Sequence, residues 1–181
     1  MITLNSDAAS TSLSKTTKAI LNEYGIKLNK NLGQNYLIDR NKRDQIIQFG
    51  NLTKDDVVLE IGPGIGTLTI ELAKRVKKVI AIEQDSNICQ ILENRLKKEN
   101  IDNVELINDD ALNVEFPKFD KIISNLPYQI SSPITFKFLN YDFQLAILMY
   151  QKEFASRMNG KVGSKDYSRL SAMLYFKCDV D

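Results

Sequence analysis

Short apolar runs alternate with amphipathic segments through most of the chain. Five of these runs predict strands that are buried on both faces: residues 57–61, 79–82, 104–107, 121–124 and 144–149. Between them, apolar positions recur every three or four residues, which predicts helices over residues 67–76, 86–99 and 132–140. Continuous apolar strands separated by helices are typical of an α/β fold, in which helices cover both faces of a parallel sheet.

The pattern predicts further helices before and after the sheet, over residues 16–24, 40–50, 152–158 and 168–178. Residues 1–14 are rich in Ser and Thr and show no apolar period, so we expect them to form a disordered tail. This division leaves residues 15–181 as one domain.

Capping residues mark where several helices should begin. Asp39 is the expected N-cap of the helix over 40–50, and either Asp85 or Ser86 is expected to cap the helix over 86–99. Ser132 followed by Pro133 predicts a cap and a first helical residue, because proline lacks the N–H that this position leaves unpaired.

Composition narrows the possible chemistry. The chain has no histidine, which excludes histidine general bases and histidine metal ligands, and Cys89 and Cys178 lack metal-ligand spacing, so we expect no metal site. Two reduced thiols, and the lack of a signal peptide or a membrane-spanning run, indicate a cytoplasmic protein that binds no membrane. The net charge is +1, so any contact with nucleic acid must depend on a local basic patch.

The fourth predicted strand leads into Asn125-Leu126-Pro127-Tyr128. The Asn125 side-chain oxygen and a backbone carbonyl can each accept one N–H of a planar amine, such as N6 of adenine. Tyr128 can stack on the ring, and Pro127 stiffens the turn because its φ is fixed. The same four residues are also consistent with an ordinary turn at the end of a strand.

The first strand runs into a glycine loop, in which Gly62, Gly64 and Gly66 follow Glu60. Glycines permit a tight turn and a close approach of a ligand to the backbone. Their spacing differs from the dinucleotide-binding pattern, because Thr67 stands where that pattern has its third glycine. A simple connection between a strand and a helix stays an alternative.

Acidic residues follow the next two strands. Glu83 ends the second strand, where a carboxylate can accept hydrogen bonds from the two hydroxyls of a ribose, although a solvated strand end explains it equally well. Asp109 and Asp110 follow the third strand, where a carboxylate can accept from an adenine amino group. The glycine loop and these acidic residues lie at successive strand ends, where open α/β sheets bind ligands.

Taken together, these motifs resemble a known family. The runs 31–39, 60–66 and 125–128, with Glu83 and Asp110-Ala111, occur in the order found in the KsgA-like small-subunit ribosomal RNA adenine dimethyltransferases. Residues 128–136 look most like the archaeal branch. The resemblance implies a Rossmann-like, class I S-adenosylmethionine-dependent methyltransferase, which makes N6,N6-dimethyladenosine in ribosome biogenesis.

The resemblance also implies roles for individual residues. It implies a pocket for S-adenosyl-L-methionine formed by Gln34, Asn35, Leu37, Gly62, Gly64, Glu83, Asp110 and Asn125, and a catalytic turn formed by Asn125, Leu126, Pro127 and Tyr128. Without the resemblance, Gln34 and Asn35 would be read as a polar loop. The implied partner is small-subunit ribosomal RNA or a pre-ribosomal particle, bound by a monomer.

Members of that family continue past the position that matches Asp181, with a β-hairpin, a base-clamping segment and a helical domain. We therefore expect a C-terminally truncated chain whose sheet has about five strands. Two basic groups could contact RNA phosphates, or could simply be solvated surface: Lys27 and Lys30, and Lys152, Arg157, Lys161, Lys165 and Arg169.

Three other functions stay open on sequence alone. The chain could be a non-catalytic fragment that assembles ribosomes or binds RNA, which its expected truncation motivates. It could be a dinucleotide oxidoreductase, although the glycine spacing argues against this. It could also be a large-subunit ribosomal RNA adenine methyltransferase, whereas Leu126-Pro127-Tyr128 and the run that follows favour the small-subunit class by resemblance.

Overall fold

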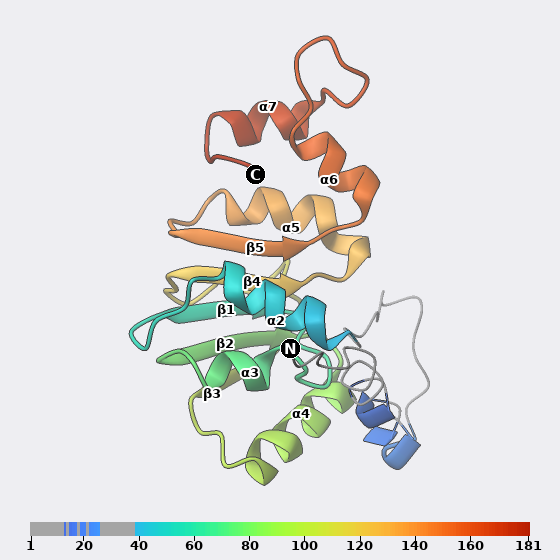
Figure 1. Ribbon diagram of the computed structural model, residues 1–181, viewed down its shortest axis with the longest axis vertical. Coiled ribbons are helices and arrows are strands. Elements are labelled where there is room, and N and C mark those ends of the chain that lie inside the picture. The colour runs from blue at the N-terminus through green and yellow to red at the C-terminus, as the bar shows by residue number, and fades with distance from the viewer. Residues whose placement is uncertain (1–12, 14, 18, 21, 26–38) are drawn as a thin grey trace, which may run out of the picture.

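The computed structural model of the chain describes residues 13, 15–17, 19, 20, 22–25 and 39–181. Within this part, five strands form one parallel sheet in the order β3-β2-β1-β4-β5 (Figure 1). The strands are β1 Val57–Ile61, β2 Lys78–Glu83, β3 Val104–Asn108, β4 Lys121–Asn125 and β5 Leu145–Met149. The predicted parallel sheet of five strands is therefore confirmed, and β1 lies at its centre.

In the described part of the chain, three α-helices connect strands of the sheet, one directly precedes β1 and two follow β5. They are α2 Arg40–Phe49, α3 Thr69–Ala73, α4 Ser86–Lys98, α5 Ser131–Phe138, α6 Lys152–Met158 and α7 Arg169–Tyr175. Each lies where the periodicity predicted a helix, although α3 and α7 are shorter than expected. Residues 13, 15–17, 19, 20, 22 and 23 are also helical, so Leu13 belongs to a helix and not to a tail. No helix of the described residues is long and apolar enough to cross a membrane.

The helix caps follow the sequence in two cases and depart from it in a third. The Asp39 carboxylate accepts from the N–H groups of residues 41 and 42, and Asp85, not Ser86, caps α4. The helix α5 begins at Ser131, one residue before the predicted cap, directly after the 3-10 turn Tyr128–Ile130. Pro133 is therefore the third helical residue, which is tolerated because the first turn of a helix leaves its N–H groups unpaired anyway.

Alternate residues of the central strands point to opposite faces of the sheet, which gives two apolar cores. One core lies beneath α2, α3 and their connections and includes Ile46, Ile47, Val58, Leu72, Val79, Ala81 and Ile123. The other lies beneath α5 and the segment after β3 and includes Leu59, Ile80, Ile82, Phe116, Ile122, Ile134 and Phe138. Because both faces are buried, the strands read as unbroken apolar runs.

A buried ion pair joins the amino ends of β1 and β4. The Lys121 ammonium lies 2.9 Å from the Asp56 carboxylate, and both side chains are 8% exposed. Lys121 also donates to the Asn51 carbonyl at 2.7 Å, while the Thr53 N–H donates to Asp56 at 2.6 Å. Burial opposes ionisation of Asp56, but these hydrogen bonds from Thr53 and Lys121 outweigh it and hold its pKa below the usual value. The pair therefore fixes the end of the sheet away from the candidate site.

A second buried carboxyl, Glu60 of β1, has no such partner. It is 2% exposed, and its Oε2 makes no hydrogen bond with any described residue. Burial raises the pKa of Glu60 to about 8, and the negative charge of Glu83 contributes to the rise. The nearby Thr69 hydroxyl offsets this only in part, because it makes no hydrogen bond of good geometry with the carboxyl. Glu60 is therefore largely protonated at neutral pH.

This carboxyl should make the chain less stable as the pH rises. Between pH 4.5 and about 8, folded Glu60 retains a proton that the unfolded chain has released, so the free energy of unfolding falls with pH across that window. Glu60→Gln keeps the shape but does not titrate, so it should remove a decline on the order of a few kcal/mol. Urea unfolding between pH 5 and pH 8 measures the effect, undisturbed by histidine, which the chain lacks.

Glu71→Gln is the matched control, because the pKa of Glu71 lies below its usual value: hydrogen bonds from Lys74 and Arg75 outweigh the effect of burial. Its stabilising effect is lost only as the pH falls, so this variant should leave the slope between pH 5 and pH 8 unchanged. An unchanged slope in Glu60→Gln would contradict the assignment.

Candidate active site

The carboxyl ends of β1, β2, β3 and β4 lie along one edge of the sheet. Gly62, Glu83 and Asn125 are the residues at or directly after the ends of β1, β2 and β4, and Asp110 follows β3 after one intervening residue. Because all four strands are parallel neighbours, the backbone brings these positions to the same edge. The remaining geometry shows how closely they are connected.

The glycine loop after β1 requires glycine for two different reasons. Gly62, Gly64 and Gly66 have φ values of 67°, 55° and 84°, a region that costs other residues about 1–2 kcal/mol. A Cβ on Gly62 would lie 2.9 Å from Cγ of Pro127, and a Cβ on Gly66 would collide with the Leu92 side chain. The first glycine therefore permits contact with the turn after β4, and the third permits close packing against α4.

Glu83 connects the end of β2 to this loop. Its Oε2 accepts the Gly64 N–H at 3.2 Å, and its Oε1 accepts the Asp85 N–H at 3.1 Å. Burial raises the pKa of Glu83, and these two N–H groups act in the opposite direction. A carboxylate oxygen can accept a second hydrogen bond, so each oxygen retains capacity for a hydroxyl of a ligand. The backbone thus holds Glu83 in an orientation suited to a diol.

Asp110 belongs to a tight turn, residues 110–114, that follows β3. Its Oδ1 accepts the Leu112 N–H at 2.9 Å, and its Oδ2 accepts the Asn113 side-chain amide at 3.3 Å. The neighbouring Asp109 is exposed, but its N–H donates to the Glu83 carbonyl at 3.1 Å and joins the ends of β2 and β3. The Asp109 carboxylate accepts the Asp110 N–H at 2.7 Å, so both carboxylates are held in place, and Asp110 is the less exposed of the two.

The turn after β4 is anchored from below. The Ser124 hydroxyl donates to the Ile61 carbonyl at 2.6 Å, and Leu126 is 2% exposed within the core beneath α5. Asn125, Pro127 and Tyr128 are half-buried at the edge of the sheet. Pro127 faces Gly62, so the turn after β4 and the glycine loop, which are far apart in the sequence, lie against each other.

Sequence reasoning missed three residues that shape this edge. Ser124 was visible as a polar residue in an apolar strand, and Glu60 as an acidic one, but neither was given a role. Arg95 of α4 donates from its guanidinium to the Ile65 carbonyl and so supports the glycine loop from beneath. No local pattern marks Arg95, because its partner is 30 residues away in the sequence.

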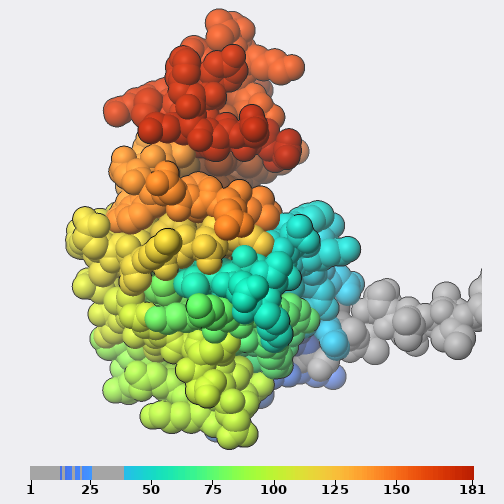
Figure 2. All heavy atoms as spheres, turned by 90° about the vertical axis from the view of Figure 1, so that its left-hand side faces the viewer, coloured from blue at the N-terminus to red at the C-terminus, as the bar shows by residue number. Residues whose placement is uncertain are grey.

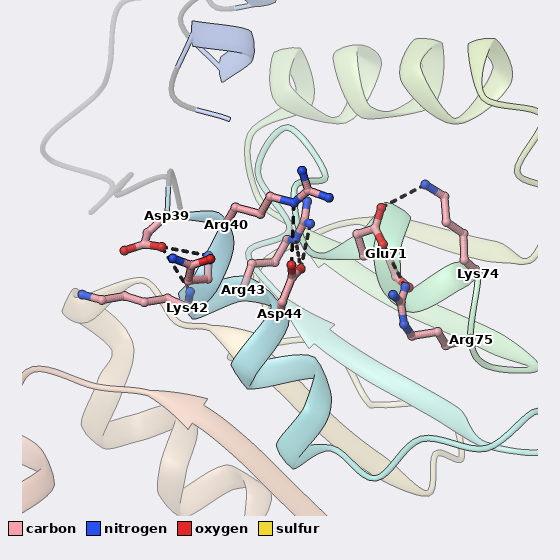
Figure 3. Close-up of polar contacts among 9 residues, drawn as sticks. Asp39, Arg40, Lys42, Arg43, Asp44, Glu71, Lys74 and Arg75 are labelled. Atoms are coloured by element: carbon pink, nitrogen blue, oxygen red, sulfur yellow. Dashed lines mark hydrogen bonds and ion pairs between the residues drawn. The ribbon is translucent and has the colours of Figure 1, made fainter. Parts of the chain in front are cut away.

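A hollow of about 130 Å³ lies on the other side of the glycine loop, between the N-terminal helical residues, α3 and α4, but it is a poor candidate site. Its charged side chains and their neighbours on α2 and α3 pair with one another (Figure 3). Glu71 lies 2.9 Å from Lys74 and 2.8 Å from Arg75, and Arg43 lies 2.7 Å from Asp44. These charges are already neutralised locally, so they offer little to a ligand.

Several predicted residues lie outside the described part of the chain. Gln34, Asn35 and Leu37, the expected cover of the cofactor pocket, are among them, as are Lys27 and Lys30. Within the described residues, no group of three or more acidic or cysteine side chains is arranged to hold a metal ion.

The chain is similar to proteins of one known family. The family model for ribosomal RNA adenine dimethylase matches residues 25–181. The chain is 55% identical to the probable ribosomal RNA small subunit methyltransferase A of Methanothermobacter thermautotrophicus and 52% identical to the protein of that name from Thermococcus sibiricus. These alignments cover 91% and 90% of the chain but 59% of each relative, so the chain spans about three-fifths of their length.

Two solved structures share the fold. A dimethyladenosine transferase from Plasmodium falciparum matches with a TM-score of 0.71 and 42% identity, over 75% of this chain and 50% of that one. The 23S rRNA methyltransferase ErmE matches with a TM-score of 0.68 and 34% identity, over 78% of this chain and 57% of that one. The expected Rossmann-like, class I methyltransferase fold is thereby confirmed. The matched region contains every motif at the carboxyl edge of the sheet, and the chain belongs to the ribosomal RNA adenine dimethylase family.

Proposed function

We propose that the chain carries the methyl-donor site and the amine site of an enzyme that dimethylates N6 of adenines in small-subunit ribosomal RNA. The observation that carries this proposal is the contact of Gly62 with Pro127, which sets a cofactor loop directly against a turn suited to a planar amine. The names of the relatives, small subunit methyltransferases and a dimethyladenosine transferase, support the same substrate, and the family resemblance implies S-adenosyl-L-methionine as the donor.

The side chains at this edge fit that donor. Glu83 retains hydrogen-bonding capacity on both carboxylate oxygens for the ribose hydroxyls, and Asp110 can accept from the adenine amino group. Gly62 and Gly64 leave the loop backbone open to close approach. Gln34, Asn35 and Leu37 would close the pocket, as the family resemblance implies. When bound, the donor would supply a methyl group from its sulfonium sulfur: the N–C bond would form as the C–S bond breaks, a neutral thioether would leave and the amine would lose a proton to water, so we propose no metal.

The turn after β4 would supply the catalytic contribution. The lone pair of adenine N6 is delocalised into the ring, which makes the amine a poor nucleophile. Hydrogen bonds from its two N–H groups to the Asn125 side-chain oxygen and the Leu126 carbonyl would favour a pyramidal nitrogen as the new bond forms. Pro127 keeps the turn rigid, and Tyr128 would stack on a base that has left its helix.

Asn125→Ala should slow methyl transfer by about 10²-fold or more, while the protein stays folded, because the amine loses one of its two acceptors. Asn140→Ala, which removes an exposed amide beyond the end of α5, is the matched control and should leave the rate unchanged. The readout is incorporation of labelled methyl groups into unmodified small-subunit RNA and particles.

The unsubstituted full-length Methanothermobacter relative serves as the positive control for the assay, and the corresponding substitution in it should lower its rate by a similar factor. If the chain binds no S-adenosylmethionine while the relative does, the proposed function is wrong, and a non-catalytic RNA-binding role is favoured. Equal rates for Asn125→Ala and the unsubstituted chain would overturn the proposed role of the turn.

The C-terminal helices offer a surface for the RNA. Together with their connection, α6 and α7 stand beyond β5 at one end of the molecule (Figure 2). Exposed on them are the cations Lys152, Arg157, Lys161, Lys165 and Arg169 and the aromatic side chains Tyr167, Tyr175 and Phe176. Basic groups contact phosphates and aromatic rings stack on unpaired bases, so this combination suits single-stranded RNA.

Lys161→Gln with Lys165→Gln should therefore weaken RNA binding and flatten its salt dependence. Each lost phosphate contact should lower the slope of log affinity against log salt by about 0.7. Lys97→Gln with Lys98→Gln removes the same charge from an exposed part of α4 and should change the slope much less. Fluorescence anisotropy at several salt concentrations measures both, and equal slopes for the two pairs would refute this surface.

We further propose a monomer that acts in the cytoplasm on a pre-ribosomal particle, where small-subunit RNA is still accessible. The similarity to ErmE gives large-subunit RNA as a second candidate substrate. Mapping the methylated nucleotide in reactions that contain both RNAs separates the two candidates.

A further inference from the structure

A half-buried cation holds the turn that carries Asp110. Lys137 lies on α5, and its Nζ donates to the carbonyls of Ala111, Leu112 and Val114 at 2.9, 3.2 and 2.5 Å. An ammonium has three N–H groups, so each finds an acceptor within one turn of the chain. The same Nζ lies 4.4 Å from the centre of the Phe116 ring, which adds a cation–π contact.

The contacts of the Lys137 ammonium stabilise the turn and do not form part of a surface ion pair. Among the described residues, Lys137 has no carboxylate partner within ion-pair distance, whereas three carbonyl oxygens converge on it. Carbonyls that point at one spot repel each other unless a cation lies between them. Without the ammonium, the peptide groups of residues 111–114 would therefore reorient.

That reorientation would reach the Asp110 carboxylate. The peptide group between Ala111 and Leu112 connects the two, because its N–H, from Leu112, donates to Asp110 while its carbonyl, from Ala111, accepts from Lys137. Asn113 donates to Asp110 from its side chain and lies between two of the carbonyls that bind Lys137. The direction of the Asp110 carboxylate is thus set by peptide groups that Lys137 holds from the other side.

The position of Lys137 is in turn fixed against the sheet. Its helix neighbours Ile134 and Phe138 are 0% and 2% exposed and pack on the core beneath α5. The helix follows the amine-binding turn directly, because Tyr128–Ile130 runs into Ser131. The Lys137 side chain therefore links the turn after β3, whose carbonyls it binds, to the helix that follows the turn after β4.

We infer that Lys137 is a positioning residue that orients Asp110 toward the adenine of the methyl donor and so sets the affinity and base selectivity of the donor site. The inference rests on the proposed function. Lys137 acts through Asp110. The turn that contains Asn125 does not depend on Lys137, because Ser124 and Leu126 anchor it separately.

Calorimetric titration of the 181-residue chain tests this with two probes, S-adenosylhomocysteine and its 6-oxo analogue, S-inosylhomocysteine, which lacks the amino group. The unsubstituted chain should bind the adenosine form more tightly. Lys137→Met should weaken binding of the adenosine form about tenfold and of the analogue much less, so that the preference shrinks. The planar guanidinium of Lys137→Arg cannot converge on three carbonyls, so the preference of this variant for adenosine should lie between those of the unsubstituted chain and Lys137→Met. Lys137→Arg also provides the test if the methionine variant does not fold.

Lys121→Met is the matched control. Lys121, like Lys137, donates to a backbone carbonyl, but it is buried and lies at the end of β4 away from Asn125. It should lower the midpoint of urea unfolding and leave the preference for adenosine unchanged, which separates positioning from stability. In an Asp110→Asn background, Lys137→Met should cause little further loss, because the two residues act in series.

The outcomes separate the two proposals. If the unsubstituted chain binds neither probe, the proposed function fails. If it binds the adenosine form and both Lys137 variants retain its affinity and preference, the inference about Lys137 fails while the proposed function stands. A loss that is equal for both probes, or is matched by Lys121→Met, would reduce Lys137 to a structural role.

Discussion

The burial of β1 from Val58 to Ile61 is the constraint on which the other features depend. Val58, Leu59, Glu60 and Ile61 are at most 2% exposed, with a strand on each side and a core on each face. After this strand the backbone first becomes partly exposed at Gly62 and Gly64 of the glycine loop. The neighbouring strands are parallel and in register, so their own polar residues reach the same edge.

The buried carboxyl groups at the two ends of the sheet have different partners. At the amino end, the Asp56 carboxylate and the Lys121 ammonium satisfy each other and the backbone around them, which favours one arrangement of β1 against β4. At the carboxyl end, Glu60 has no cation, and Glu83 is bound only by backbone N–H groups. The first end is electrostatically complete, and the second retains unused hydrogen-bonding capacity. This difference suits the amino end of the sheet to a structural role and the carboxyl end to the binding of a ligand.

The sequence predicted those parts of the fold that depend on local periodicity or local hydrogen bonds. The five strands and the caps at Asp39 and Asp85 are of this kind, because each is decided by residues within one or two turns. The predicted start of α5, with Ser132 as cap and Pro133 as first helical residue, was wrong by two residues, because proline is compatible with more than one position in the first turn. The strand-end positions of Gly62, Glu83, Asp110 and Asn125 followed from parallel topology alone.

The supporting contacts of the site could not be predicted. Ser124 finds its acceptor 63 residues away, Arg95 finds its own at 30 residues, and Lys137 binds carbonyls 23 to 26 residues earlier. A lysine on an amphipathic helix reads as solvated surface until the packing angle of that helix is known. Contacts of this kind exist only once the sheet has assembled, so they leave no periodic trace in the sequence.

The approach of Gly62 to Pro127 has a consequence for how such a protein can change over generations. No side chain fits at position 62 while the proline ring remains, and a different residue at 127 would free the space but loosen the turn. Neither motif can therefore drift without the other, although 64 residues separate them along the chain. The two positions should therefore change together or not at all, and neutral substitutions should accumulate around this pair rather than within it.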